Sequence, residues 1–161
     1  MFTFARRAAA LIVLPIAAAG AALAIGAAPA TAATPAALQA QVVSLTNSYR
    51  AKAGCGAVRP NTLLIRTAYR HSWDMAQHGY FSHTSPGGST FAARARYSGY
   101  NHAIGENIAW GYTSASTLVG AWMRSPGHRA NILNCRARSV GVAVSYTRGG
   151  TPYWTQVFGG V

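Results

Sequence analysis

The order of two hydrophobic periods along this chain constrains its fold more than any other feature. A helical period comes first, because four apolar residues recur four, three and four positions apart: Leu38, Val42, Leu45 and Tyr49. A strand period comes last, because residues 140–146 alternate between large apolar and small side chains. Helices that precede strands, without a regular alternation of the two, predict helices packed on a small antiparallel sheet.

Local signals predict the bounds of the other elements. We expect helices at residues 34–53, 63–78 and 90–97, a helix capped by Ser114 or Ser116, and one or two helical turns at 129–133. We expect strands at 140–146 and 152–158. Residues 80–88 and the segment from Gly99 to Glu106 are expected to be loops, Gly79 to cap the second helix, and Trp73 to be half-buried.

The first 32 residues have the pattern of a secretory signal peptide. Arg6 and Arg7 form a short basic region, an apolar run follows to about residue 28, and the sequence Ala30-Thr31-Ala32 is typical of a cleavage site. The alternative is a membrane anchor, because the apolar run is long for a signal peptide. We expect cleavage after Ala32, secretion, and a single mature domain at residues 33–161 that is not an integral membrane protein.

The mature chain is strongly basic and has almost no acids. The sequence has 14 Lys and Arg and 2 Asp and Glu, so loss of Arg6 and Arg7 leaves 12 cations against Asp74 and Glu106, a net charge of +10. Such a surface attracts polyanions, among them anionic cell-wall polymers. The alternative is that the Arg-rich composition reflects the genome. Aromatic and basic residues do not interleave as in nucleic-acid modules, so no specific nucleic acid is expected.

The two cysteines, Cys55 and Cys135, predict a disulfide, because an even count in an exported chain favours pairing. The bond would close a loop of 80 residues and stabilise the fold by about 4 to 5 kcal/mol through the entropy of the unfolded chain. The rival interpretation is a catalytic thiol, which requires an unpaired cysteine.

Three polar residues are candidates for a functional site: His83, Glu106 and His128. Two histidines and one carboxylate form the ligand set of an open metal site, so zinc or another divalent cation is the expected cofactor. The three residues lie 23 and 22 positions apart, which is not a local metal-binding motif, and each histidine alone could be a structural group. Protonation of the histidines would weaken metal binding below about pH 6.

The ordered motifs of the mature chain resemble a known family. They include Gly79-Tyr80-Phe81-Ser82-His83, Gly105-Glu106-Asn107 and the run from Ser125 to Leu133, with further matches at residues 47–50, 72–76, 140–142 and 153–158. Together they are similar, over about 110 residues, to the bacterial branch of the CAP superfamily of cysteine-rich secretory, antigen 5 and pathogenesis-related proteins. The resemblance implies a three-layer α-β-α sandwich with a central cleft.

The resemblance also implies that two histidines and two acids line the cleft, and that several relatives bind zinc or another divalent cation there. The matching positions here are His83, His128 and Glu106. The second acid usually lies between the first histidine and the Gly-Glu-Asn sequence, but residues 84–105 contain no Asp or Glu. The set of four is therefore incomplete.

Divalent-cation-dependent ligand binding in a His/Glu-lined cleft is the function we expect, in preference to catalysis. Three alternatives remain open: sterol or other lipid binding in an aromatic groove, a metal-dependent, protease-like hydrolase with Glu106 as general base, and a cell-wall-associated protein held by its charge. A glycosidase needs two placed carboxylates, which this chain does not offer. His71, His78, His102 and Asp74 are expected to be structural.

Overall fold

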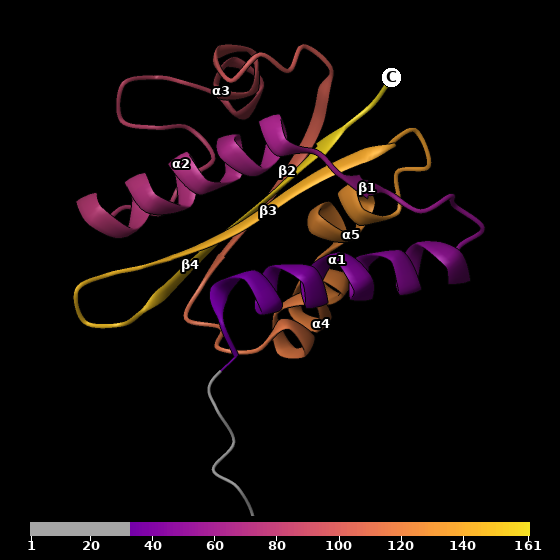
Figure 1. The fold of residues 1–161 in the computed structure, drawn as a ribbon, viewed down its shortest axis with the longest axis horizontal. Coiled ribbons are helices and arrows are strands. Elements are labelled where there is room, and N and C mark those ends of the chain that lie inside the picture. Colours follow the sequence, from indigo (N-terminus) through magenta and orange to yellow (C-terminus); the bar gives the residue numbers. More distant parts are fainter. Residues whose placement is uncertain (1–32) are drawn as a thin grey trace, which may run out of the picture. The chain divides into compact units, whose positions relative to one another are not determined.

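A four-stranded sheet crosses the middle of the domain with helices on both faces (Figure 1). The structure, a computed structural model, describes residues 33–161. The predicted signal peptide at residues 1–32 lies outside the described residues and stays a prediction. Within residues 33–161 no helix has the length and apolar character needed to cross a bilayer.

The strands are β1 (Arg59–Pro60), β2 (Ala103–Trp110), β3 (Ser139–Tyr146) and β4 (Pro152–Gly159), and their order in the sheet is β1-β3-β4-β2. β3 and β4 form the predicted antiparallel pair, and β2 pairs antiparallel with β4. The sequence did not predict β1, which adds a parallel pair with β3 to the predicted antiparallel sheet and makes it mixed. Two residues are too few to show a strand period in the sequence.

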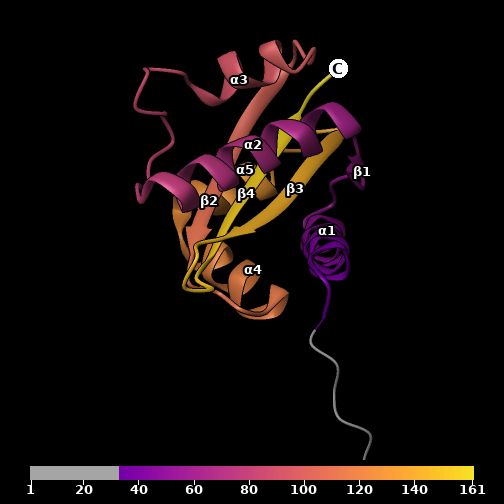
Figure 2. The ribbon, with the colours of Figure 1, turned by 60° about the vertical axis from the view of Figure 1, so that its left-hand side comes forward.

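Five helices make the other two layers, as the resemblance implies. They are α1 (Pro35–Lys52), α2 (Thr62–His78), α3 (Phe91–Tyr97), α4 (Ala115–Arg124) and α5 (Pro126–Ile132). Helices α2 and α3 cover one face of the sheet, and α1, α4 and α5 cover the other (Figures 1 and 2). The fold is therefore an α-β-α sandwich.

The helix ends follow their capping signals. Thr34, Asn61, Thr90 and Ser114 accept backbone N–H bonds at the N-termini of α1 to α4. Gly79 ends α2 with a φ of +68°, as predicted. Helix α5 begins earlier than predicted, because Pro126 occupies its first turn, where the absent N–H costs nothing.

The alternating strand β3 separates the two cores. Its large residues Val140, Val142 and Val144 pack with α1, α4 and α5. Its small residues face α2, and at Gly141 the backbone of Leu64 lies so close that a Cβ would overlap it. The alternation that predicts the strand therefore also sets how closely α2 approaches the sheet.

Two neighbouring aromatic residues of α2 differ strongly in burial. Trp73 is 46% exposed, so its side chain is half-buried, as predicted. His71, two residues earlier, is completely buried. The difference arises because His71 faces the sheet, whereas the Trp73 ring lies over an open groove beside α2.

The guanidinium of Arg50, near the end of α1, holds two loop segments against the helices by hydrogen bonds to their carbonyl oxygens. The residue is completely buried and donates five hydrogen bonds of 2.8–3.0 Å to the carbonyl oxygens of Gly56, Ile132, Asn134 and Ala137. These carbonyls belong to the segment after α1, to the last residue of α5 and to the chain between α5 and β3. The predicted disulfide Cys55–Cys135 joins the same two segments, with a Cα–Cα distance of 4.9 Å.

We expect Arg50→Lys to lower the free energy of unfolding by about 3 kcal/mol. Lysine has three donors instead of a planar fork of five, so at least one buried carbonyl loses its partner. Urea unfolding followed by circular dichroism measures the loss. Arg138→Lys is the matched control, since Arg138 is exposed and its side chain makes one hydrogen bond, to the Cys135 carbonyl. Equal stability of the two variants would contradict this role of Arg50.

We expect Gly141→Ala to destabilise the fold by about 3 kcal/mol, because its methyl group would overlap the backbone of Leu64. The control is Gly149→Ala in the β3–β4 turn, where a Cβ would meet only Thr147 Oγ1 at 3.8 Å. Chemical denaturation of both variants tests the expectation. A G141A protein as stable as G149A would show that α2 is not held as closely as described.

Candidate functional site

The carboxylate of Glu106 lies on an edge strand and not in a loop. The sequence prediction of a loop from Gly99 to Glu106 is wrong, because residues 103–110 form β2. Residues 105–109 are all buried, so this strand has no alternation of polar and apolar residues to reveal it. Strand geometry sends the side chains of Glu106 and Asn107 to opposite faces of the sheet.

Glu106 is a buried anion, and its side chain is 1% exposed. Its Oε2 accepts a hydrogen bond of 2.7 Å from Nη2 of Arg94 on α3. Its Oε1 lies 3.0 Å from Nδ1 of His83 and 3.9 Å from Nε2 of His71. The ion pair with Arg94 and the bond from His83 offset the cost of removing a carboxylate from water.

Sequence reasoning missed Arg94. It also fixes the loop that carries His83, since it donates to the carbonyl oxygens of Ser89 at 2.6 Å and His83 at 3.0 Å. A usable signal was present in the sequence. A buried carboxylate needs a cation beside it, and residues 84–105 offer only Arg94 and Arg96. The segment that lacks the second acid therefore supplies a cation instead.

His71 lies beneath this cluster, although sequence reasoning gave it only a structural role. Its Nε2 is 2.9 Å from the carbonyl oxygen of Ser82, which can only accept, so Nε2 carries the proton. Burial lowers the pKa of His71 below its ordinary value, against the opposing effect of Glu106. The ring is therefore neutral at pH 7 and supports the loop before His83.

His128 comes from the other side of β2, at the start of α5. Its backbone carbonyl accepts from Nδ2 of Asn107, while Asn131 donates to the Asn107 side chain and the Glu106 carbonyl. Burial, and secondarily the charge of His83, lower the pKa of His128. Of the three predicted residues, the structure thus places His83 and Glu106 in contact. His128 lies close enough to His83 for the charge of His83 to lower its pKa.

His128 lines a hollow of about 490 Å³ whose walls are largely aromatic. Phe81, Trp110 and Tyr112 contribute to the lining, and Tyr153 stacks on Trp110 with ring centroids 6.4 Å apart. Phe81 and Trp110 are 46% and 55% exposed, so they do not fill the core. By contrast, Trp122 and Trp154 are completely or almost completely buried.

The remaining acid lies away from Glu106. Asp74 accepts a hydrogen bond from the Tyr80 hydroxyl and lies 2.8 Å from Nδ1 of His78. Burial, together with the hydrogen bond to Asp74, raises the pKa of Tyr80 to about 12. Asp74 thereby holds the start of the loop after α2. No three His, Cys, Asp or Glu side chains cluster as metal ligands anywhere in residues 33–161.

Comparison with known proteins gives a consistent match. The sequence pattern of the family described as "CAP: Cysteine-rich secretory protein family" matches residues 43–158. The uncharacterized protein YkwD of Bacillus subtilis (strain 168) is 39% identical over 123 residues, which are 76% of this chain and 47% of YkwD.

Solved structures share the fold. An extracellular protein containing an SCP domain from Bacillus anthracis str. Ames superposes with a TM-score of 0.68 at 28% identity, over 80% of this chain and 44% of that chain. The crystal structure of NaASP2 with Zn2+ superposes with a TM-score of 0.56 at 14% identity, over 83% of this chain and 84% of that one. The chain spans about half the length of YkwD and of the B. anthracis protein.

The pKa values of His71 and His128 are both lowered in the folded protein, so we expect the protein to lose stability in acid. In the unfolded chain they bind protons near pH 6.5, whereas in the folded chain they do so only at lower pH. Protons therefore bind preferentially to the unfolded state, and the free energy of unfolding falls as the pH drops from 7 to 5. Urea unfolding at several pH values should show this slope.

His71→Gln should flatten that slope, because glutamine keeps a donor for the Ser82 carbonyl but does not titrate. The exposed His102 provides the control, H102Q. An H71Q protein with an unchanged slope would indicate that His71 is not the group whose protonation opposes folding.

Proposed function

The chain belongs to the cysteine-rich secretory protein (CAP) family, and from this premise we propose that His83 and His128 bind a divalent cation that helps to hold a ligand in the adjacent aromatic hollow. The observation that carries the proposal is the contact of 3.0 Å between His83 Nδ1 and Glu106 Oε1. A carboxylate only accepts hydrogen bonds, so the neutral ring has its proton on Nδ1 and its lone pair on Nε2. Nε2 is therefore the nitrogen suited to a metal.

This arrangement is the one that metal-binding histidines usually have. Their second nitrogen donates to a carboxylate or carbonyl, which fixes the tautomer and the orientation of the ring. Glu106 performs this task for His83, and Arg94 in turn holds Glu106 through its other oxygen at 2.7 Å. The donor set fits a borderline cation such as Zn2+, which would use imidazole nitrogens.

The role of Glu106 in this proposal differs from a direct metal ligand. Both of its oxygens already accept N–H bonds, from Arg94 and His83. We therefore propose that Glu106 orients the His83 ring, and that water molecules complete the coordination of the cation. The direct bond between Glu106 and a metal is untested and stays a prediction. NaASP2, a protein of the same fold solved with Zn2+, supports the choice of probe.

We propose ligand binding in preference to hydrolysis, because Glu106 is constrained between two N–H donors and is poorly placed to take a proton from water. The ligand's apolar part would contact Phe81 and Trp110, whose exposed rings border the hollow that His128 lines. Lipid binding in this hollow is the second candidate, favoured by the same rings. We place the protein outside the cell, in agreement with its Cys55–Cys135 disulfide and with the extracellular B. anthracis relative.

Zinc titration calorimetry tests the cation site. We expect saturable binding at one site, lost in the His83→Ala/His128→Ala double variant and retained in His78→Ala, which removes the histidine beside Asp74. Glu106→Gln should weaken binding about 10- to 100-fold without abolishing it, as for other groups that orient a metal-binding histidine. Affinity should fall below about pH 6, because protonated histidines do not bind a cation.

Two outcomes would contradict the proposal. Zinc binding that survives the double variant would place the cation elsewhere. Complete loss in a folded E106Q protein, with circular dichroism unchanged, would make Glu106 a direct ligand and return the site to the three-residue set predicted from sequence.

A further inference from the structure

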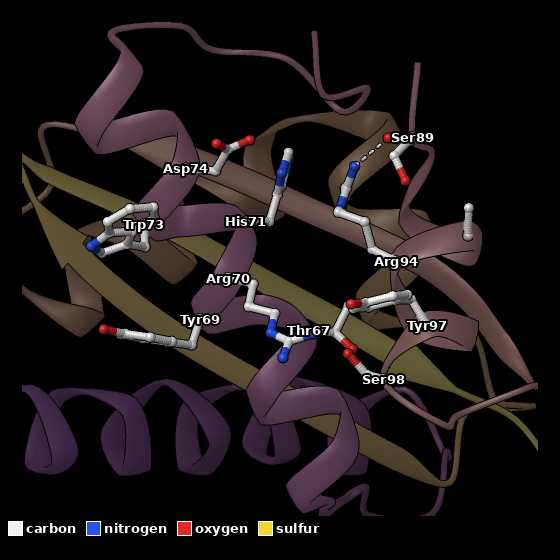
Figure 3. A pocket seen from close by; sticks show the side chains of 11 residues that line it. Thr67, Tyr69, Arg70, His71, Trp73, Asp74, Ser89, Arg94, Tyr97 and Ser98 are labelled. Atoms are coloured by element: carbon white, nitrogen blue, oxygen red, sulfur yellow. Dashed lines mark hydrogen bonds between the residues drawn. The ribbon is translucent and has the colours of Figure 1, made fainter. Parts of the chain in front are cut away.

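A second hollow, which we call the α2–α3 groove, lies between these two helices and has a volume of about 490 Å³. No residue lines both this groove and the hollow of His128. Figure 3 shows its lining, which includes Thr67, His71 and Trp73 from α2 and Arg94, Tyr97 and Ser98 from α3 and its cap. Its volume is in the usual range for small-molecule sites.

Buried polar atoms without partners gather at this groove. In the described part of the chain, four buried side-chain nitrogen or oxygen atoms have no hydrogen-bond partner, and three belong to residues of the groove: His71 Nδ1, Arg94 Nε and Ser98 Oγ. His71 is 0% and Ser98 2% exposed. Buried polar atoms are normally paired, so this concentration indicates a partner from outside the chain.

The chemistry of two of these atoms specifies the missing group. His71 Nε2 donates to the Ser82 carbonyl, so Nδ1 of the neutral ring is an acceptor that needs a donor. Arg94 Nε can only donate, so it needs an acceptor. A hydroxyl group is both donor and acceptor, and the two side chains lie next to each other across the groove (Figure 3).

A negatively charged group fits this position poorly. Glu106 already pairs with Arg94 at 2.7 Å and lies 3.9 Å from His71 Nε2. A second anion would meet the charge of Glu106 and the lone pair of His71 Nδ1. The unpartnered atoms therefore favour an uncharged hydroxyl over a carboxylate or phosphate.

The walls of the groove favour a flat apolar ring. Tyr69, Trp73 and Tyr97 are large aromatic residues that are 52%, 46% and 83% exposed, and all three line it. Aromatic rings pack favourably on other flat rings. A sugar would bring several hydroxyls where His71 Nδ1 and Arg94 Nε need one, whereas a flat ring system with one hydroxyl matches both the walls and the unpartnered atoms.

We propose that the α2–α3 groove binds an uncharged phenol-type molecule, an aromatic ring system with one hydroxyl. The hydroxyl donates to His71 Nδ1 and accepts from Arg94 Nε, and the rings lie against Trp73 and Tyr97. The hydroxyl supplies both missing hydrogen-bond partners. Removal of the hydroxyl from the ligand should therefore lower its affinity more than a change of the ring does.

The test titrates the purified protein with 2-naphthol, 2-methoxynaphthalene, naphthalene and 2-naphthoate, followed by 1H–15N correlation spectra. We expect 2-naphthol to bind at least about tenfold more tightly than the other three, because only it can make both hydrogen bonds without a charge. The methoxy compound can accept from Arg94 but cannot donate to His71. Equal binding of naphthol and naphthalene would overturn the proposal and indicate that water serves these polar atoms.

Variants locate the binding site. Trp73→Ala removes an exposed wall and should weaken 2-naphthol binding about tenfold, whereas Trp110→Ala, at the other aromatic hollow, should leave it unchanged. His71→Phe should abolish the preference for naphthol over naphthalene. Because His71 is buried, W73A keeps the proposal falsifiable if H71F does not fold. No binding of 2-naphthol at millimolar concentration, or a loss in W110A but not in W73A, would overturn the proposal.

Discussion

The buried guanidinium of Arg50 is the interaction on which the rest of this structure depends. The chain has only two acids, so a buried cation cannot rely on a carboxylate, and backbone carbonyls take that role. Two of these carbonyls, those of Ile132 and Asn134, lie at and just after the C-terminal end of α5, where the helix dipole favours a cation. Because α5 begins beside His128, the anchor at its far end also fixes the helix that carries a candidate ligand.

Glu106 presents the opposite problem, a buried anion in a basic protein. Arg94 neutralises it and at the same time holds the His83 loop through backbone carbonyls. This arrangement explains how the cleft keeps its geometry without the second acid expected from the family resemblance. Arg94 also lines the α2–α3 groove, so the cation that holds Glu106 connects the candidate cation site with that groove, although the two hollows share no lining residue.

Sequence patterns predicted those helices and strands whose side-chain periodicity matches the packing of their faces in the structure. Helix α1 has one buried face, and strand β3 places large side chains on one face and small ones on the other, so both periods appear directly in the sequence. The errors fall where tertiary packing overrides local pattern. Strand β2 is buried at Gly105–Ala109 by the layers around it, so its Gly-Glu-Asn sequence resembles a turn, and β1 is recognisable only from its pairing with Val140.

The sequence by itself determined the family, the order of helices and strands, the disulfide and the identity of His83, Glu106 and His128 as candidates. Only the tertiary structure decided that Arg94 and His71 join Glu106, and which of their atoms are left unpaired. The physical reason is that periodicity and capping act between residues a few positions apart, and so can be read along the chain. The partner of a buried charge is chosen by burial and distance in three dimensions, which no local pattern records.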